Sequence, residues 1–108
     1  EGIVISPNGR YVAVSVINGS SASKTSPLYH DFSLLKVLEI SGRKLQLVAE
    51  TKLGHWCQGA AWTPNGSTVL AQCMVEQGIQ MFSFDGRALK PAGAIKVNGG
   101  PSGFRTAR

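Results

Sequence analysis

Two similar turn signals divide the chain into repeated units. Ser6-Pro7-Asn8-Gly9 and Thr63-Pro64-Asn65-Gly66 each combine a proline, which presets φ for a turn, with a glycine that tolerates positive φ. Short apolar runs lie on both sides of each turn, as expected for β-hairpins. A second pair of similar segments, residues 40–45 and 84–89, follows the two hairpins. The chain therefore consists of repeated structural units.

Each unit is predicted to contain four short β-strands. Thirteen glycines and five prolines supply turns, and no window shows the 3.6-residue apolar periodicity of a helix. The first unit, residues 1–53, also carries a polar, turn-rich insertion at residues 18–32. The expected strands are 2–5, 11–17, 34–40 and 45–50 in the first unit and 58–62, 68–74, 79–84 and 92–97 in the second, residues 54–98. Residues 99–108 are expected to add one further strand, at 103–106.

The second strand of each unit is apolar on both faces, as in residues 11–16 and 69–74. A four-stranded sheet with two apolar faces can bury both only against neighbouring sheets, which is the arrangement of propeller blades. We therefore predict an all-β fold. Its architecture is a β-propeller fragment with two four-stranded antiparallel blades and one extra C-terminal strand.

The Pro-Asn-Gly turns, preceded in the second unit by Gln58-Gly59-Ala60-Ala61-Trp62, resemble the repeats of lactonase-like, YVTN-type seven-bladed β-propellers. This family is largely bacterial and includes 6-phosphogluconolactonase-type enzymes. Residues 99–107 are similar to the C-terminal end of such proteins. The resemblance implies a fold, but repeat motifs do not identify an activity.

Two blades cannot close a ring of seven. The resemblance therefore implies partners for the exposed blade faces. They are expected to be the remaining blades of the same propeller, preceding this segment, or further copies of this chain.

Cys57 and Cys73 lie on the two strands of the second hairpin. If Trp62 pairs with Thr68 next to the turn, Cys57 lies opposite Cys73. Opposed cysteines can form a disulfide, can be two buried small hydrophobic residues, or can supply a reactive thiol or metal ligand. A disulfide would favour a periplasmic or extracellular location over the cytoplasm. No Cys-x-x-Cys or His-x-x-x-His spacing indicates a metal site.

The resemblance also implies a candidate ligand site at the channel mouth. In similar propellers, the connection entering the inner strand and the connection between strands two and three lie on the same face. His55 and Trp56 would then lie beside Tyr29 and His30 of the insertion, where they could stack on and hydrogen-bond a small polar ligand. Arg105 could hold an anion in the channel. The alternative is that these are ordinary packing, surface and tail residues.

Two functions remain open. The first is a non-catalytic binding or scaffold propeller. The second is a lactone hydrolase similar to the 6-phosphogluconolactonase type, in which His55, His30 and Arg105 are the candidates for water activation and carboxylate binding. A WD-repeat docking module is disfavoured because no Trp-Asp dipeptide ends a strand, and no motif implies a cofactor.

The distribution of charge and the length of the apolar runs argue against nucleic acid and a membrane span as partners. The net charge is +5, but the eleven lysines and arginines are scattered, which describes a solvated surface better than a groove that follows nucleic-acid phosphates. No apolar run approaches the ~18 residues that a membrane-spanning helix requires.

Overall fold

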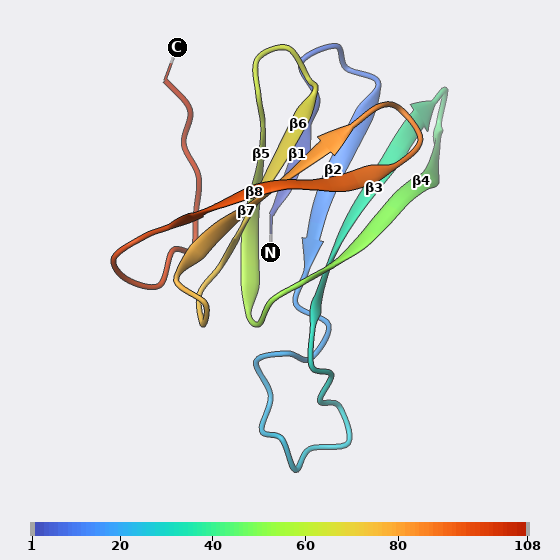
Figure 1. The fold of residues 1–108 in the computed structure, drawn as a ribbon. Helices are drawn as coiled ribbons and strands as arrows, with labels where there is room; N and C mark the ends of the chain where they lie inside the picture. The colour runs from blue at the N-terminus through green and yellow to red at the C-terminus, as the bar shows by residue number, and fades with distance from the viewer. Residues whose placement is uncertain (1, 108) are drawn as a thin grey trace.

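The computed structural model describes residues 2–107, a range that holds eight β-strands and no helix. They are β1 (Ile3–Ile5), β2 (Tyr11–Val16), β3 (Ser33–Ser41), β4 (Lys44–Leu53), β5 (Cys57–Trp62), β6 (Thr68–Cys73), β7 (Gly78–Phe84) and β8 (Leu89–Lys96). Sheet 1 contains β1 to β4 and sheet 2 contains β5 to β8, each antiparallel and in sequence order (Figure 1). The all-β prediction, with four strands in each unit, is confirmed.

Residues 1 and 108, which the predicted units include, lie outside the described residues. Within the described range, nothing forms a helix long and apolar enough to cross a membrane.

Both Pro-Asn-Gly segments form tight turns for the same local reasons. Gly9 and Gly66 adopt φ of 73° and 72°, a conformation that costs other residues free energy. Each glycine N–H donates to the carbonyl three residues earlier, at 2.9 and 2.8 Å. The side-chain oxygens of Asn8 and Asn65 accept the backbone N–H two residues later, at 2.9 and 3.1 Å. The turns are therefore specified by residues within them.

The core lies between the two sheets, which pack face to face. The buried side chains that form it are Ala13, Leu35, Val37, Ala49 and Leu53 from sheet 1, with Cys57, Ala60, Trp62, Val69, Ala71, Cys73, Phe82 and Phe84 from sheet 2. Burying each larger aliphatic or aromatic side chain contributes about 1.5–3 kcal/mol. The Trp62 indole N–H also donates to the Val4 carbonyl at 3.1 Å, so that a hydrogen bond joins the inner strands of the two sheets.

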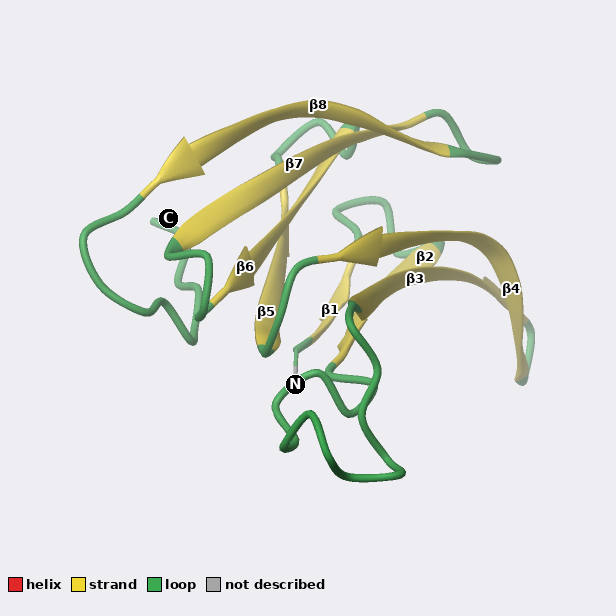
Figure 2. Ribbon diagram, turned by 60° about the horizontal axis from the view of Figure 1, so that its bottom comes forward, coloured by secondary structure: helices red, strands yellow, loops and turns green. Residues whose placement is uncertain are grey.

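The two sheets form a wedge that is closest at its inner strands. β5 lies against β1 and β2, whereas the outer strands β4 and β8 diverge (Figure 2). Glycine permits the close approach, because a Cβ on Gly2 would stand 2.5 Å from the Gly59 Cα. The wedge leaves the outer face of each sheet without a partner sheet in the described part of the chain.

The second hairpin differs from its predicted register. Trp62 pairs with Val69, one residue beyond the predicted partner, and a β-bulge that contains Gly59 then restores the register so that Cys57 lies opposite Cys73. Gly59 has a φ of 84°, a positive value that β-bulges often require and that glycine adopts easily. The two cysteines form a disulfide, and both are buried.

The C-terminal segment also differs from its prediction. Residues 99–107 form no strand, and within residues 2–107 the segment makes no backbone hydrogen bond to β5. Phe104 and Thr106 instead line a groove with Trp62 and Pro64. A strand requires a ladder of backbone hydrogen bonds, and this segment contains three glycines and Pro101, which has no N–H to donate.

Candidate functional site

The connection between β2 and β3, residues 17–32, contains the insertion and projects from one end of sheet 1 (Figure 1). Its base is held by buried Ser20, whose hydroxyl donates to the Ile17 carbonyl at 2.7 Å and lies 2.7 Å from the Ser33 hydroxyl. The Trp56 N–H donates to the same Ser20 oxygen at 2.8 Å. The insertion is therefore attached to the segment that enters β5, and the half-exposed Trp56 lies beside it.

A cluster of four polar side chains extends this attachment. His55 lies between two carboxylates, with its Nε2 at 2.7 Å from Asp31 of the insertion and its Nδ1 at 2.6 Å from Glu76 of the β6–β7 turn. The His55 backbone N–H donates to the other Glu76 oxygen at 2.8 Å, and the Tyr29 hydroxyl donates to Asp31 at 2.7 Å. We call Tyr29, Asp31, His55 and Glu76 the His55 cluster.

The pKa shifts in the His55 cluster favour the charged forms of three residues, Asp31, His55 and Glu76, which together make an ion triad. Hydrogen bonds to Asp31 and then to Glu76 raise the pKa of His55 above its ordinary value of 6.5. The hydrogen bond from His55 lowers the pKa of Asp31. Burial acts to raise the pKa of Glu76, but the hydrogen bonds from the His55 ring and backbone outweigh it, and the pKa lies below its ordinary value. The hydrogen bond to Asp31 raises the pKa of Tyr29.

This geometry makes His55 a bridge. Carboxylates face both ring nitrogens, an arrangement that favours the doubly protonated, positively charged imidazole ring. Neither nitrogen is then free to take a proton from water, which is the first requirement of a general base. The cluster joins the insertion of the first unit to the β6–β7 turn of the second by charge-assisted hydrogen bonds.

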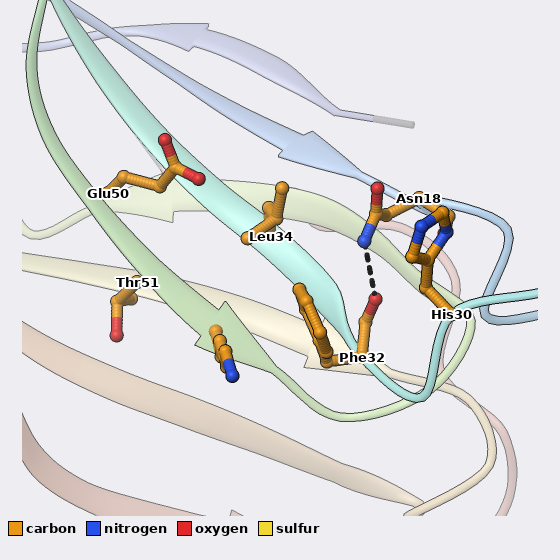
Figure 3. A pocket seen from close by; sticks show the side chains of 7 residues that line it. Asn18, His30, Phe32, Leu34, Glu50 and Thr51 are labelled. Carbon is orange, nitrogen blue, oxygen red and sulfur yellow. Dashed lines mark hydrogen bonds between the residues drawn. The ribbon is translucent and has the colours of Figure 1, made fainter.

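His30 lines a different cavity, of about 510 Å³ (Figure 3). The lining residues are Asn18, His30, Phe32, Leu34, Glu50, Thr51 and Lys52. His30 Nδ1 lies 3.0 Å from the Asn18 carbonyl, and the Asn18 side-chain amide donates to the Phe32 carbonyl at 3.1 Å. The Lys52 ammonium lies 4.4 Å from the centre of the Phe32 ring. The cavity thus combines an apolar floor with groups of both charges.

The predicted site residues are therefore divided among three places. Tyr29 and His55 meet through Asp31, and Trp56 adjoins the base of the insertion. His30 belongs to the cavity. Arg105 is exposed, and its neighbours Phe104 and Thr106 lie beside Pro64, at the turn end of β5, whereas His55 precedes the other end of that strand.

The sulfurs of Cys57 and Cys73 lie within 4.8 Å of a Glu76 oxygen, close enough for the three groups to ligate one ion. The sulfurs are joined in a disulfide, however, and a disulfide offers no thiolate. While the disulfide is intact, Cys57, Cys73 and Glu76 therefore do not form a metal site.

Sequence reasoning missed the roles of Glu76, Glu50, Phe32 and Lys52. One sequence signal could have identified Glu76 as a neighbour of the insertion. The β6–β7 turn occupies the same place in the second unit as the insertion does in the first, between strands two and three. The cavity residues had no comparable signal, because Glu50 is the last residue of the predicted strand 45–50 and Lys52 lies beyond it, whereas β4 continues to Leu53.

Comparison of the chain with protein-family models and with curated protein sequences found no match.

Proposed function

We propose that the two sheets are adjacent blades of a lactonase-like β-propeller that acts as a non-catalytic binding or scaffold protein. The repeated turn and strand segments and the wedge of two sheets that meet at their inner strands support this architecture. The outer faces would be covered by the remaining blades of the same propeller or by further copies of this chain. The bound molecule would be a small polar ligand.

The main support for a binding function is the cavity beside the insertion. Phe32 and Leu34 provide an apolar surface, and Glu50 and Lys52 place opposite charges on β4 at the edge of that surface. A zwitterion with a short apolar chain matches this pattern, because its ammonium would pair with Glu50 and its carboxylate with Lys52. His30 can add a hydrogen bond through its Nε2 (Figure 3).

Binding is preferred over lactone hydrolysis for a geometric reason. Hydrolysis would need a base positioned to activate water and a cation near the developing carboxylate. Both ring nitrogens of His55 are occupied by Asp31 and Glu76, and Arg105 lies at the opposite end of β5. The residues proposed for catalysis therefore do not share one site in this arrangement.

Titration with norleucine, followed by backbone amide NMR, tests the binding function. We expect saturable shifts at Phe32, Leu34 and Glu50, and severalfold weaker binding in the Lys52→Ala and Glu50→Gln variants. Lys44→Ala, at the exposed start of the same strand, is the matched control and should bind as the wild type does. Shifts that do not saturate, or that persist unchanged in Lys52→Ala, would contradict the proposed site.

A further inference from the structure

The outer face of sheet 1, which points away from sheet 2, carries an apolar patch. Its apolar residues are Ile3, Ile5, Val12, Val14, Leu38 and Leu47, which the strand register places on one side of the sheet. Lys36 lies beside Val14 on the same side and pairs with Glu50 of β4. Ile5 is 59% exposed and Ile3 is 74% exposed. Contiguous apolar surface of this kind usually marks an interaction site.

The outer face of sheet 2 is also apolar. By the same register argument it consists of Leu70, Gln72, Ile79, Met81 and Ile95. Ile95 is 45% exposed, and the buried Gln72 side-chain nitrogen has no hydrogen-bond partner within residues 2–107. The C-terminal segment reaches this face at its inner end, where Gly100 approaches Met74.

The repeat identifies what the outer face of sheet 1 is built to contact. Aligning the two Pro-Asn-Gly turns makes Ile5 equivalent to Trp62, and aligning residues 40–45 with 84–89 makes Leu38 equivalent to Phe82. Trp62 and Phe82 are side chains of sheet 2 that are buried against sheet 1. The exposed face of sheet 1 therefore corresponds to the face of sheet 2 that sheet 1 covers.

The converse holds for the other exposed face. Leu70 is equivalent to Ala13 and Met81 to Val37 under the same two alignments. Ala13 and Val37 are core residues of sheet 1 that sheet 2 covers completely. The two exposed faces are thus repeat copies of the two halves of the interface that already joins the sheets.

From this correspondence we propose that copies of the chain associate head to tail, with the outer face of sheet 2 of one copy on the outer face of sheet 1 of the next. The proposal rests on the repeat architecture of the proposed function and specifies its partner surface. The contact is heterologous, since it joins two different faces, and it continues the packing of sheet 1 on sheet 2.

A heterologous contact makes a prediction that a symmetric one does not. A copy with a damaged sheet 1 face retains an intact sheet 2 face, and a copy with a damaged sheet 2 face retains an intact sheet 1 face. Neither variant can associate with itself, but one of each can form a single intact contact. Mixing two monomeric variants should therefore produce a dimer.

Sedimentation velocity on the 108-residue chain measures this directly. The variants are Ile5→Lys on sheet 1 and Ile95→Lys on sheet 2, and Leu28→Lys in the insertion, at a side chain that is 73% exposed, is the matched control. Thermal melts establish that each variant folds. We expect the wild type and the control to associate with rising concentration, each face variant to sediment at 11.4 kDa, and their equimolar mixture to sediment at twice that mass.

Three results would overturn the proposal. They are a wild type that remains monomeric up to hundreds of micromolar, an Ile5→Lys or Ile95→Lys variant that still self-associates, and a folded mixture that stays monomeric. Norleucine binding by the monomeric Ile95→Lys variant distinguishes the two proposals. That variant leaves the cavity intact, so the ligand site can stand where head-to-tail association fails.

Discussion

Removing the Cys57–Cys73 disulfide is expected to lower the free energy of unfolding by about 3 kcal/mol. The bond closes a loop between cysteines 16 residues apart, across the second hairpin. In the chain-entropy account, a cross-link over a loop of about 15 residues stabilises a protein by about 3 kcal/mol, because it restricts the unfolded chain. For a domain of about 100 residues, this loss corresponds to a fall in Tm of roughly 12–24 °C.

The position of the bond gives it a local role as well. The β-bulge at Gly59 interrupts the pairing of β5 with β6, and the disulfide joins the strands just beyond the interruption. The Met74 N–H donates to the Trp56 carbonyl at 3.1 Å, next to the bridge. Opening the bond should therefore increase hydrogen exchange at Met74 before it affects amides near the turn.

Urea denaturation with and without a phosphine reductant measures the loss, and the Cys57→Ala/Cys73→Ala variant is its genetic counterpart. Trp62 is buried in the core, so its fluorescence reports unfolding. The reductant should lower the stability of the wild type and leave the double variant unchanged. The loop-closure reasoning is refuted if thiol labelling shows complete reduction and the unfolding free energy changes by less than about 1 kcal/mol.

Three further predictions concern the His55 cluster, the bulge and the core. The pKa of His55 in the folded state is raised above 6.5, so the cluster contributes its full stabilisation of the fold below pH 6.5 and loses it as the pH rises through the folded-state pKa. The free energy of unfolding of the wild type should therefore fall as the pH rises through that range. The His55→Gln variant should lack this pH dependence. Gly59→Ala should destabilise the chain by about 1–3 kcal/mol in urea titrations, because it forces an L-residue to positive φ and places a Cβ 2.6 Å from a buried side-chain nitrogen. Phe82→Ala should cost about 3–5 kcal/mol by the same assay, because it empties part of the core between the sheets.

Controls make these outcomes decisive. Leu28→Ala removes an exposed insertion side chain and should leave the urea midpoint unchanged. A Gly59→Ala variant as stable as the wild type would contradict the assigned bulge conformation. A wild type and a His55→Gln variant with the same pH profile would show that the triad does not stabilise the fold.

Much of the fold was accessible from local signals. The Pro-Asn-Gly turns, the alternating apolar residues and the repeated segments each act over a few residues, so they predicted two four-stranded units. They also predicted that Cys57 lies opposite Cys73, but from a register that is one residue off at Trp62 and that the bulge at Gly59 compensates. The local errors have local causes. The bulge leaves Gly59 at a positive φ with the Gln72 side chain close to it, and the C-terminal segment lacks the backbone pairing that would make it a strand.

The sequence by itself determined the strands, the turns and the apolar character of both sheet faces, because these follow from backbone preferences and from the side-chain alternation of a strand. Only the tertiary structure decided which polar groups meet. His55 binds Asp31 and Glu76, which are 24 and 21 residues away, because the packing of sheet 1 on sheet 2 brings three connections to one end of the wedge. No local preference encodes that approach, so the division of the predicted residues between the His55 cluster and the cavity emerged only when the sheets were packed together.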